Sequence, residues 1–253
     1  MLKIILPLLL VVQIAASQVA IQDCSIGQST IQIKTEHFQP AYPGIYFINL
    51  HANETTSIEA TTAYLATVGG SFLQLIHGQV RYVDFTLNNT AYKIDPNRIF
   101  TQQGRKETLK KNSSYNLLAE KETARFADTI LAQLKDAKLI VAMHNNTDGD
   151  LSITSYTKGK NEAINAADVY INKDMDADDF VYTTERSIFE HLKKQQINVV
   201  LQKAKGFKDD GSLSVYCGTK HIPYINIEAQ QGHKEQQLRI LQALTSILEQ
   251  YQK

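Results

Sequence analysis

The sequence predicts an α/β fold, with a mixed, mostly parallel twisted sheet and helices on both of its faces. Short apolar runs of strand length alternate along the chain with longer segments of helical spacing, as in consecutive strand–helix–strand units. No Pro- or Gly-rich linker, internal repeat or low-complexity tract divides the chain after residue 17. Residues 18–253 are therefore expected to form a single domain.

Five short segments are predicted as strands because apolar, branched and aromatic residues dominate them. They are residues 44–50, 80–86, 138–143, 197–202 and 222–227. The run Leu-Ile-Val-Ala-Met at 139–143 is apolar throughout, which is typical of a central strand that is covered on both faces.

Four longer segments have the apolar spacing of helices. They are residues 57–68, 115–134, 184–195 and 235–251. The first is expected to end at Gly69-Gly70, since glycine often follows a helix C-terminus. The last is amphipathic. Its apolar residues on one broad side are Leu238, Ile240, Leu241, Leu244, Ile247 and Leu248.

Residues 1–17 have the features of a secretory signal peptide. Lys3 gives a positive start, the run 4–16 is apolar apart from Gln13, and small residues precede a cleavage position near Ser17. The run is shorter than the roughly 20 apolar residues that span a bilayer, and no later segment is long enough. We therefore expect a secreted or periplasmic protein with no membrane span in the mature chain.

Charge and cysteine content narrow the classes of function. The chain carries 26 basic and 26 acidic side chains, which excludes a nucleic-acid binder held by bulk positive charge. Cys24 and Cys217 leave two alternatives open in an exported chain: one disulfide that joins the N-terminal segment to the body, or two separate thiols. Sequence spacing does not distinguish between them, because it does not give distance.

Polar side chains stand at the ends of three predicted strands. His51 and Glu54 follow the first strand, and His144 follows the central one. Glu228 follows the last. In open α/β sheets, functional groups gather outside the carboxyl ends of the strands. We therefore expect these four side chains to meet at one edge of the sheet.

Two imidazoles and one carboxylate, with water in the open position, form a catalytic zinc set. We predict that His51, Glu54 and His144 bind Zn²⁺, which lowers the pKa of water and polarises a carbonyl group. Glu228 is the candidate for a carboxylate that takes the water's proton and passes it to a leaving amine. Each of these side chains alone also has an ordinary structural role. It is their shared position at strand ends that favours the metal site.

Four short motifs in this order resemble those of the carboxypeptidase A-like zinc metallopeptidases and amidohydrolases. They are His51-x-x-Glu54, Asp95-Pro96-Asn97-Arg98-Ile99-Phe100, His144 after an apolar strand, and Gly211-Ser212 followed by Tyr224-Ile225-Asn226-Ile227-Glu228 and Gly232. The resemblance covers roughly residues 40–250. It implies a zinc carboxypeptidase-like sandwich, with His51, Glu54 and His144 as zinc ligands and Glu228 as general base and then general acid.

The same resemblance assigns the substrate-binding residues. Asn97 and Arg98 match the pair that grips the terminal carboxylate of a substrate, and a guanidinium can bind a carboxylate bidentately. Arg81 lies at the spacing of the arginine that polarises the scissile carbonyl and stabilises the oxyanion. A structural position in the predicted strand 80–86 is an equally good interpretation of Arg81.

The sequence departs from the family pattern at two places. Where the family has a tyrosine that contacts the substrate, shortly before the Gly-Ser turn, this chain has Phe207 without a hydroxyl. Tyr156 and Tyr216 are the candidates to replace it. The residue after the third zinc ligand is usually small, and here it is Asn145. These departures bear on substrate specificity more than on the metal site.

An acidic run lies outside these motifs. Its residues are Asp174, Asp176, Asp178 and Asp179. Oxygen ligands suit calcium, but the run lacks the glycine and the distal Glu of a recognised calcium loop. We therefore interpret it as a solvated loop.

Together these observations predict an exported zinc-dependent hydrolase that cleaves an amide or peptide bond next to a free carboxylate. The expected substrate is a small peptide, a cell-wall peptide or an N-acyl amino acid. The alternative is a non-catalytic secreted protein of the same fold that binds zinc or a carboxylate-bearing ligand. Measurement of bound zinc distinguishes the zinc-dependent hydrolase from a protein that binds only a carboxylate-bearing ligand.

Overall fold

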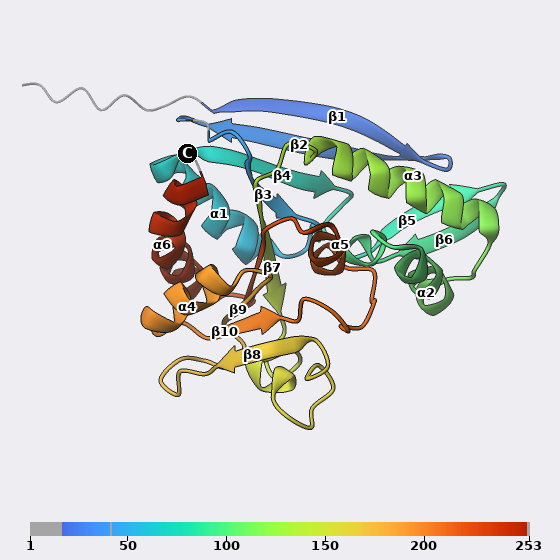
Figure 1. Ribbon diagram of the computed structural model, residues 1–253. Helices are drawn as coiled ribbons and strands as arrows, with labels where there is room; N and C mark the ends of the chain where they lie inside the picture. The colour runs from blue at the N-terminus through green and yellow to red at the C-terminus, as the bar shows by residue number, and fades with distance from the viewer. Residues whose placement is uncertain (1–16, 41, 252–253) are drawn as a thin grey trace, which may run out of the picture.

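The computed structural model describes residues 17–40 and 42–251 (Figure 1). The predicted signal peptide, residues 1–17, lies outside this part of the chain except for Ser17, so it stays a prediction. Among the described residues, no helix combines the length and the apolar character that crossing a bilayer requires.

A nine-stranded sheet forms the centre of the molecule (Figure 1). In spatial order its strands are β1 (Gln18–Ile26), β2 (Ser29–Phe38), β4 (Gly70–Ile76), β3 (Ile45–Asn49), β7 (Leu139–Asn146), β11 (Tyr224–Gln230), β9 (Phe180–Thr183), β10 (Val199–Gln202) and β8 (Ala166–Tyr170). The four central strands, from β4 to β11, are mutually parallel. Antiparallel pairs join them to the outer strands, and β9 and β10 are parallel. The predicted α/β class is confirmed.

Helices cover both faces of this sheet. One layer contains α1 (Thr55–Val68), α4 (Arg186–Lys194) and α6 (Lys234–Tyr251). The other contains α2 (Gln102–Asn112), α3 (Leu117–Gln133) and α5 (Leu213–Lys220). The two large core clusters lie between each layer and the sheet, because successive side chains of a strand point to opposite faces.

Strand β7 shows this alternation most clearly. Ile140 and Ala142 belong to the core cluster under α3 and α5, whereas Val141 and Met143 belong to the cluster under α1 and α6. His144 follows Ile140 and Ala142 at the same two-residue spacing, so it lies on the same face of the strand. The strand therefore projects His144 toward the α5 layer, at the end where the apolar series stops.

The sequence located most of the central elements but not their exact ends. Strands β7 and β11 run beyond the predicted segments, so His144 and Glu228 lie inside strands and not after them. Arg81 lies before β5 (Val83–Leu87), not within a strand from residue 80. Within the described part of the chain, strand β5 pairs only with β6 (Thr90–Ile94), in a separate hairpin. Its two turn residues, Asn88 and Asn89, have positive φ angles of 49° and 61°, as a tight two-residue hairpin turn requires.

The two cysteines form no disulfide. Cys24 in β1 and Cys217 in α5 are both buried free thiols within the same core cluster. Burial raises the pKa of the Cys217 thiol, which keeps it in the unreactive neutral form. Of the two alternatives that the sequence left open, the structure has separate thiols.

Candidate active site

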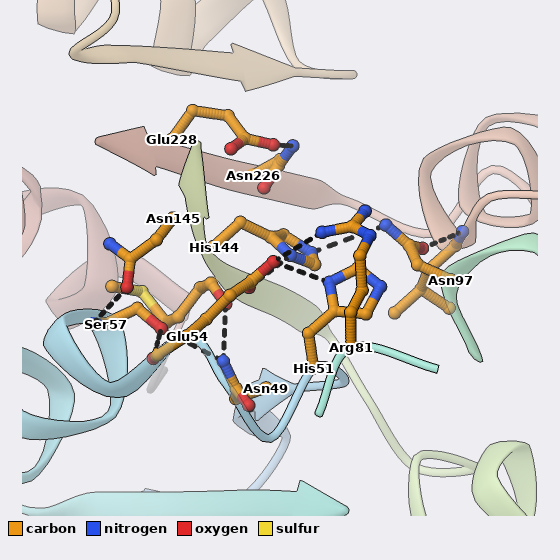
Figure 2. Close-up of polar contacts among 12 residues, drawn as sticks. Asn49, His51, Glu54, Ser57, Arg81, Asn97, His144, Asn145, Asn226 and Glu228 are labelled. Carbon is orange, nitrogen blue, oxygen red and sulfur yellow. Dashed lines mark hydrogen bonds and ion pairs between the residues drawn. The ribbon is translucent and has the colours of Figure 1, made fainter. Parts of the chain in front are cut away.

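The three residues that the sequence analysis assigns to zinc meet on one side of the sheet (Figure 2). Glu54 contacts both histidines: its Oε1 is 2.7 Å from His51 Nδ1, and its Oε2 is 3.0 Å from His144 Nδ1. One ligand atom from each residue lies within 4.8 Å of the other two. Their side chains are at most 3% exposed. A single metal ion could therefore contact all three.

A tight turn between β3 and α1 supplies two of these side chains. The Glu54 amide donates to the His51 carbonyl at 3.0 Å, which folds the two residues together. Glu54 occupies the position before the first residue of α1, but its side chain does not cap the helix. The carboxylate is therefore free to contact the histidines. Asn145 accepts a hydrogen bond from the Ser57 amide at 2.9 Å, which ties the start of α1 to β7.

Parallel pairing of β7 and β11 brings His144 beside Glu228 (Figure 2). The two residues are direct partners in the strand register, so their side chains project from the same face. Gln237 in α6 donates to the His144 carbonyl at 2.7 Å. This contact from the opposite layer holds the end of β7 in place.

A second carboxylate lies behind His51. Asp95 Oδ1 is 2.8 Å from His51 Nε2, so the imidazole is held between two carboxylates. Arg81 contacts both carboxylates: its guanidinium is 3.0 Å from Glu54 and 3.4 Å from Asp95. A carboxylate on the outer nitrogen of a histidine orients the inner nitrogen toward a metal. The sequence analysis gave Asp95 no role, although its position at the start of the Asp-Pro-Asn-Arg segment was a signal for one.

The charges of this cluster shift its protonation equilibria strongly. Burial alone would lower the pKa of His51, but the charge of Glu54 and hydrogen bonds to Asp95 and Glu54 raise it from 6.5 to about 9. Burial would raise the pKa of Glu54, but the two histidines lower it from 4.5 to about 2. The pKa of Asp95 is also lowered: burial acts against this, and His51 and the neighbouring arginines outweigh it. The cluster therefore favours a positive charge between its carboxylates.

The donor set fits zinc. Two histidine nitrogens and one carboxylate are zinc ligands of catalytic type, and Asp95 supplies the outer hydrogen bond that such histidines usually make. Glu54 and Asp95 bring two negative charges, and Arg81 brings one positive charge. Without metal, a proton on His51 supplies the missing positive charge. A divalent cation at the same place would supply it instead.

Asn97 connects the carboxylate-binding segment with this cluster. Its backbone amide donates to Asp95 at 2.9 Å, which caps a short 3₁₀ helix, η1 (Pro96–Arg98). Its side-chain oxygen accepts from the Leu213 amide at 3.0 Å, at the start of α5, and its side-chain nitrogen is 3.5 Å from His144.

Two glycines pack against each other behind Arg98. A Cβ atom on Gly104 would lie 2.6 Å from the Arg98 carbonyl oxygen and would collide with Gly211. The Gly211 carbonyl accepts from the Phe100 amide at 3.0 Å. This close backbone approach fixes η1 against the Gly-Ser turn. The Arg98 guanidinium then lies 3.6 Å from Asp210.

Arg98 stands where two hollows adjoin. A cavity of about 70 Å³ is lined by Glu228 and Asn97, and a hollow of about 530 Å³ is lined by Arg81 and Asp95. Arg98, Lys208 and Asp210 line both. The residues assigned to catalysis and to carboxylate binding therefore border adjacent space on one side of the molecule.

Glu228 is buried at the wall of the smaller cavity. Burial raises the pKa of its carboxyl, although the nearby His144 and a hydrogen bond from Asn226 at 3.0 Å act in the opposite direction. A carboxylate with a raised pKa is a stronger base than one in water, and its conjugate acid can return the proton. This is the property that a group needs to take up a proton and then release it.

Tyr156 and Tyr216 were the candidates to replace the substrate-contacting tyrosine of the family. Of these two, Tyr156 alone lies at the cavity. Tyr156 lines it together with Phe207, and burial raises the pKa of its hydroxyl well above the usual value. Tyr216 packs on Phe100 instead, with ring centroids 6.5 Å apart, and does not line the cavity.

The acidic run 174–179 differs from the expected solvated loop. Asp178 and Asp179 are buried, and backbone amides satisfy them: Gly149 donates to Asp178 at 2.7 Å and Gln230 to Asp179 at 3.0 Å. His233 also contacts Asp179, at 3.1 Å. These contacts give the carboxylates a structural role, because they anchor the loop to the ends of β7 and β11.

Comparisons with known proteins bear on the fold. No protein-family model matches the sequence, and no curated protein compared with it is a match. Among solved structures, thrombin activatable fibrinolysis inhibitor is similar with a TM-score of 0.53 and 10% identity, over 92% of this chain and 72% of that one. Murein-tripeptide amidase MpaA from Escherichia coli O157 is similar at 0.45 and 13%, over 86% of each chain. The ectoine utilization protein EutE from Ruegeria pomeroyi is similar at 0.49 and 9%, over 92% and 67%.

At these identities, structural similarity concerns the fold alone. The match to thrombin activatable fibrinolysis inhibitor extends over nearly the whole described chain and includes the central sheet with its two helix layers. The chain therefore has the zinc carboxypeptidase-like fold that the sequence resemblance implies.

Proposed function

We propose that this protein is a zinc-dependent hydrolase that cleaves an amide or peptide bond next to a free carboxylate. One observation carries the proposal: a buried His51–Glu54–His144 group lies beside a buried glutamate, Glu228, and Glu228 lines a cavity together with Arg98. We also propose that the chain is exported, on the composition of residues 1–17.

In the proposed reaction, zinc held by His51, Glu54 and His144 would lower the pKa of water and polarise the substrate carbonyl. Glu228 accepts a proton from the attacking water as the new carbon–oxygen bond forms. It then returns that proton to the leaving nitrogen as the carbon–nitrogen bond breaks. The products are a carboxylic acid and a free amine, so atoms and protons balance.

Two arginines have separate parts in this proposal. Arg98 and Asn97 bind the free carboxylate of the substrate, since Arg98 reaches the cavity that Glu228 lines. Arg81 lies against Glu54 and borders the larger hollow, where its partly exposed guanidinium can stabilise negative charge on the carbonyl oxygen. The charged groups thus surround the scissile bond from two sides.

Hydrolysis of matched substrates tests the proposal. Purified protein is analysed for bound zinc and assayed with an N-benzoylglycyl amino acid and with the same compound carrying a C-terminal carboxamide. We expect zinc near one per chain, hydrolysis of the free acid, and at least a tenfold preference over the amide. A protein that binds zinc but cleaves neither compound favours the non-catalytic binding protein. Absence of zinc binding overturns the metal site.

A further inference from the structure

The smaller cavity has two chemically different ends. Arg98, Lys208 and Asp210 line both the cavity and the adjoining hollow, so they mark its mouth. The remaining polar wall, here called the inner wall, lines the smaller cavity but not the larger hollow, and the Lys208 amide joins it to the mouth by a hydrogen bond to Asn165 at 2.8 Å. Its residues include Tyr156, Glu162, Asn165, Tyr182 and Asn226. A ligand carboxylate held by Arg98 would therefore leave its side chain directed toward this inner wall.

Glu162 gives the inner wall a carboxylate without a positive partner. Among the described residues, Asn165 is the one side chain that donates a hydrogen bond to it, at 2.7 Å. Within residues 17–40 and 42–251, no Lys, Arg or His nitrogen lies within 4.0 Å of it, whereas Asp210 at the mouth is 3.6 Å from Arg98. Lys208 is exposed and lies at the mouth. Glu162 is thus a carboxylate of the cavity wall with no cation beside it among the described residues.

Asn226 adds a second acceptor that nothing in the chain satisfies. Its side-chain nitrogen donates to Glu228 at 3.0 Å, which turns its oxygen away from that carboxylate. This oxygen is buried and has no hydrogen-bond partner among the described residues. Buried acceptors are normally paired, because an unpaired one loses its contact with water without compensation. A donor group on a ligand would satisfy it.

We propose that the residue released by this hydrolase carries a cationic side chain, a primary ammonium of the size found in lysine or ornithine, which Glu162 and Asn226 bind. The cavity of about 70 Å³ has room for about five water-sized groups, which suits a short alkyl ammonium. The rings of Tyr156 and Tyr182 lie 5.4 Å apart in its wall and offer an apolar surface for the alkyl stem. This inference rests on the proposed function.

A panel that differs only in side-chain charge tests it. The substrates are N-benzoylglycyl-lysine, the norleucine compound, which lacks the ammonium, and the glutamate compound. We expect kcat/KM for lysine to exceed that for norleucine by about 10- to 100-fold, as for a hydrogen bond between charged groups. Glu162→Gln should remove most of this preference, because kcat/KM for lysine falls toward that for norleucine. Glu162→Lys should shift the preference toward glutamate. The matched control, Glu190→Gln on the surface of α4, should keep the wild-type ratio.

Product binding separates failure of this inference from failure of the proposed function. Calorimetry with the zinc-loaded protein compares free L-lysine with L-norleucine, in wild type and in Glu162→Gln. Tighter binding of lysine that depends on Glu162, without hydrolysis of any substrate, supports the cationic site and overturns the hydrolase. Equal affinity for both amino acids, or equal turnover of both substrates, overturns the inference and leaves the hydrolase intact.

Discussion

The ion-pair cluster around His51 and the cavity beyond Glu228 are both buried and polar, but they differ in how their polar groups are satisfied. In the cluster, Glu54 has three charged or ionisable partners and Asp95 has two, all within 3.4 Å. In the cavity, Glu162 has no cation and the Asn226 oxygen has no partner among the described residues. The first region is complete without a substrate, and the second is not.

This difference indicates that the two regions have separate functions. A cluster whose groups hold one another in place is organised for a permanent ion, since its geometry does not depend on substrate. A cavity with unpaired acceptors is organised for a guest that comes and goes. Variants in the cluster should therefore change metal binding, and variants at the cavity should change turnover or selectivity while zinc remains bound.

The largest effect should come from Glu228→Gln, which keeps the shape of the side chain but removes the base. We expect kcat to fall by about 100- to 10,000-fold with zinc content unchanged, because general acid–base groups contribute on this scale. Turnover and metal analysis on the same sample measure both. Glu235→Gln, an exposed glutamate in α6, is the control. Unchanged turnover in Glu228→Gln would show that Glu228 is not the general base. Loss of zinc from this variant would show that Glu228 contributes to metal binding.

Asp95→Asn should act on the metal instead. The amide cannot replace the charge that orients His51, so we expect zinc affinity to fall by about 10- to 100-fold. Competition with a chelator measures the dissociation constant. Asp84→Asn, at an exposed aspartate in β5, should leave it unchanged. If Asp95→Asn retains wild-type affinity, the cluster is not organised around a metal.

Arg98→Lys keeps a positive charge but loses the planar fork. Lysine cannot bind a carboxylate bidentately, so we expect kcat/KM for free-acid substrates to fall by about 10- to 100-fold, mainly through KM. Zinc content should not change. Arg186→Lys on the surface of α4 is the control. An equal loss on amidated substrates would contradict carboxylate binding by Arg98.

Gly104→Ala tests how the cavity mouth is held. The added methyl group would meet Gly211 and the Arg98 carbonyl oxygen, which are backbone and cannot move separately. We expect the free energy of unfolding to fall by about 1–3 kcal/mol, as for overpacking elsewhere. Denaturant titration measures it. Gly218→Ala in α5 meets mainly the flexible Gln202 side chain and should cost less. A greater loss at Gly218 would refute this account of the close approach.

The smallest effect concerns the stability of metal-free protein at different pH. The pKa of His51 is raised from 6.5 to about 9, so its stabilising contribution is complete below pH 6.5 and is lost as the pH rises through 9. We expect the melting temperature of metal-free protein to fall by several degrees over this range. Zinc-loaded protein and metal-free His51→Gln should change less. If the melting temperatures of all three samples depend on pH in the same way, protonation of His51 does not stabilise the metal-free protein.

Some buried elements were predicted from local pattern, whereas the buried strands β4 and β9 were missed. Strands β3 and β7 are apolar runs, and α6 has an unbroken apolar side, so local pattern and tertiary burial agree. The outer hairpin of β1 and β2 was missed because the first six residues of β1 are exposed, and exposed edge strands have no strict apolar pattern. Short α2 was missed for the same reason, since it is mostly polar.

The sequence alone determined the kinds of residue available: an H-x-x-E pair after an apolar strand, a distant histidine, and a glutamate near the chain's end. Only the tertiary structure decided which of them meet. The register that pairs Glu228 with His144, and the hairpin that returns Asp95 to His51, join segments separated by dozens of residues. Local pattern specifies which face a side chain occupies, whereas the neighbour across a strand depends on how the whole sheet is ordered.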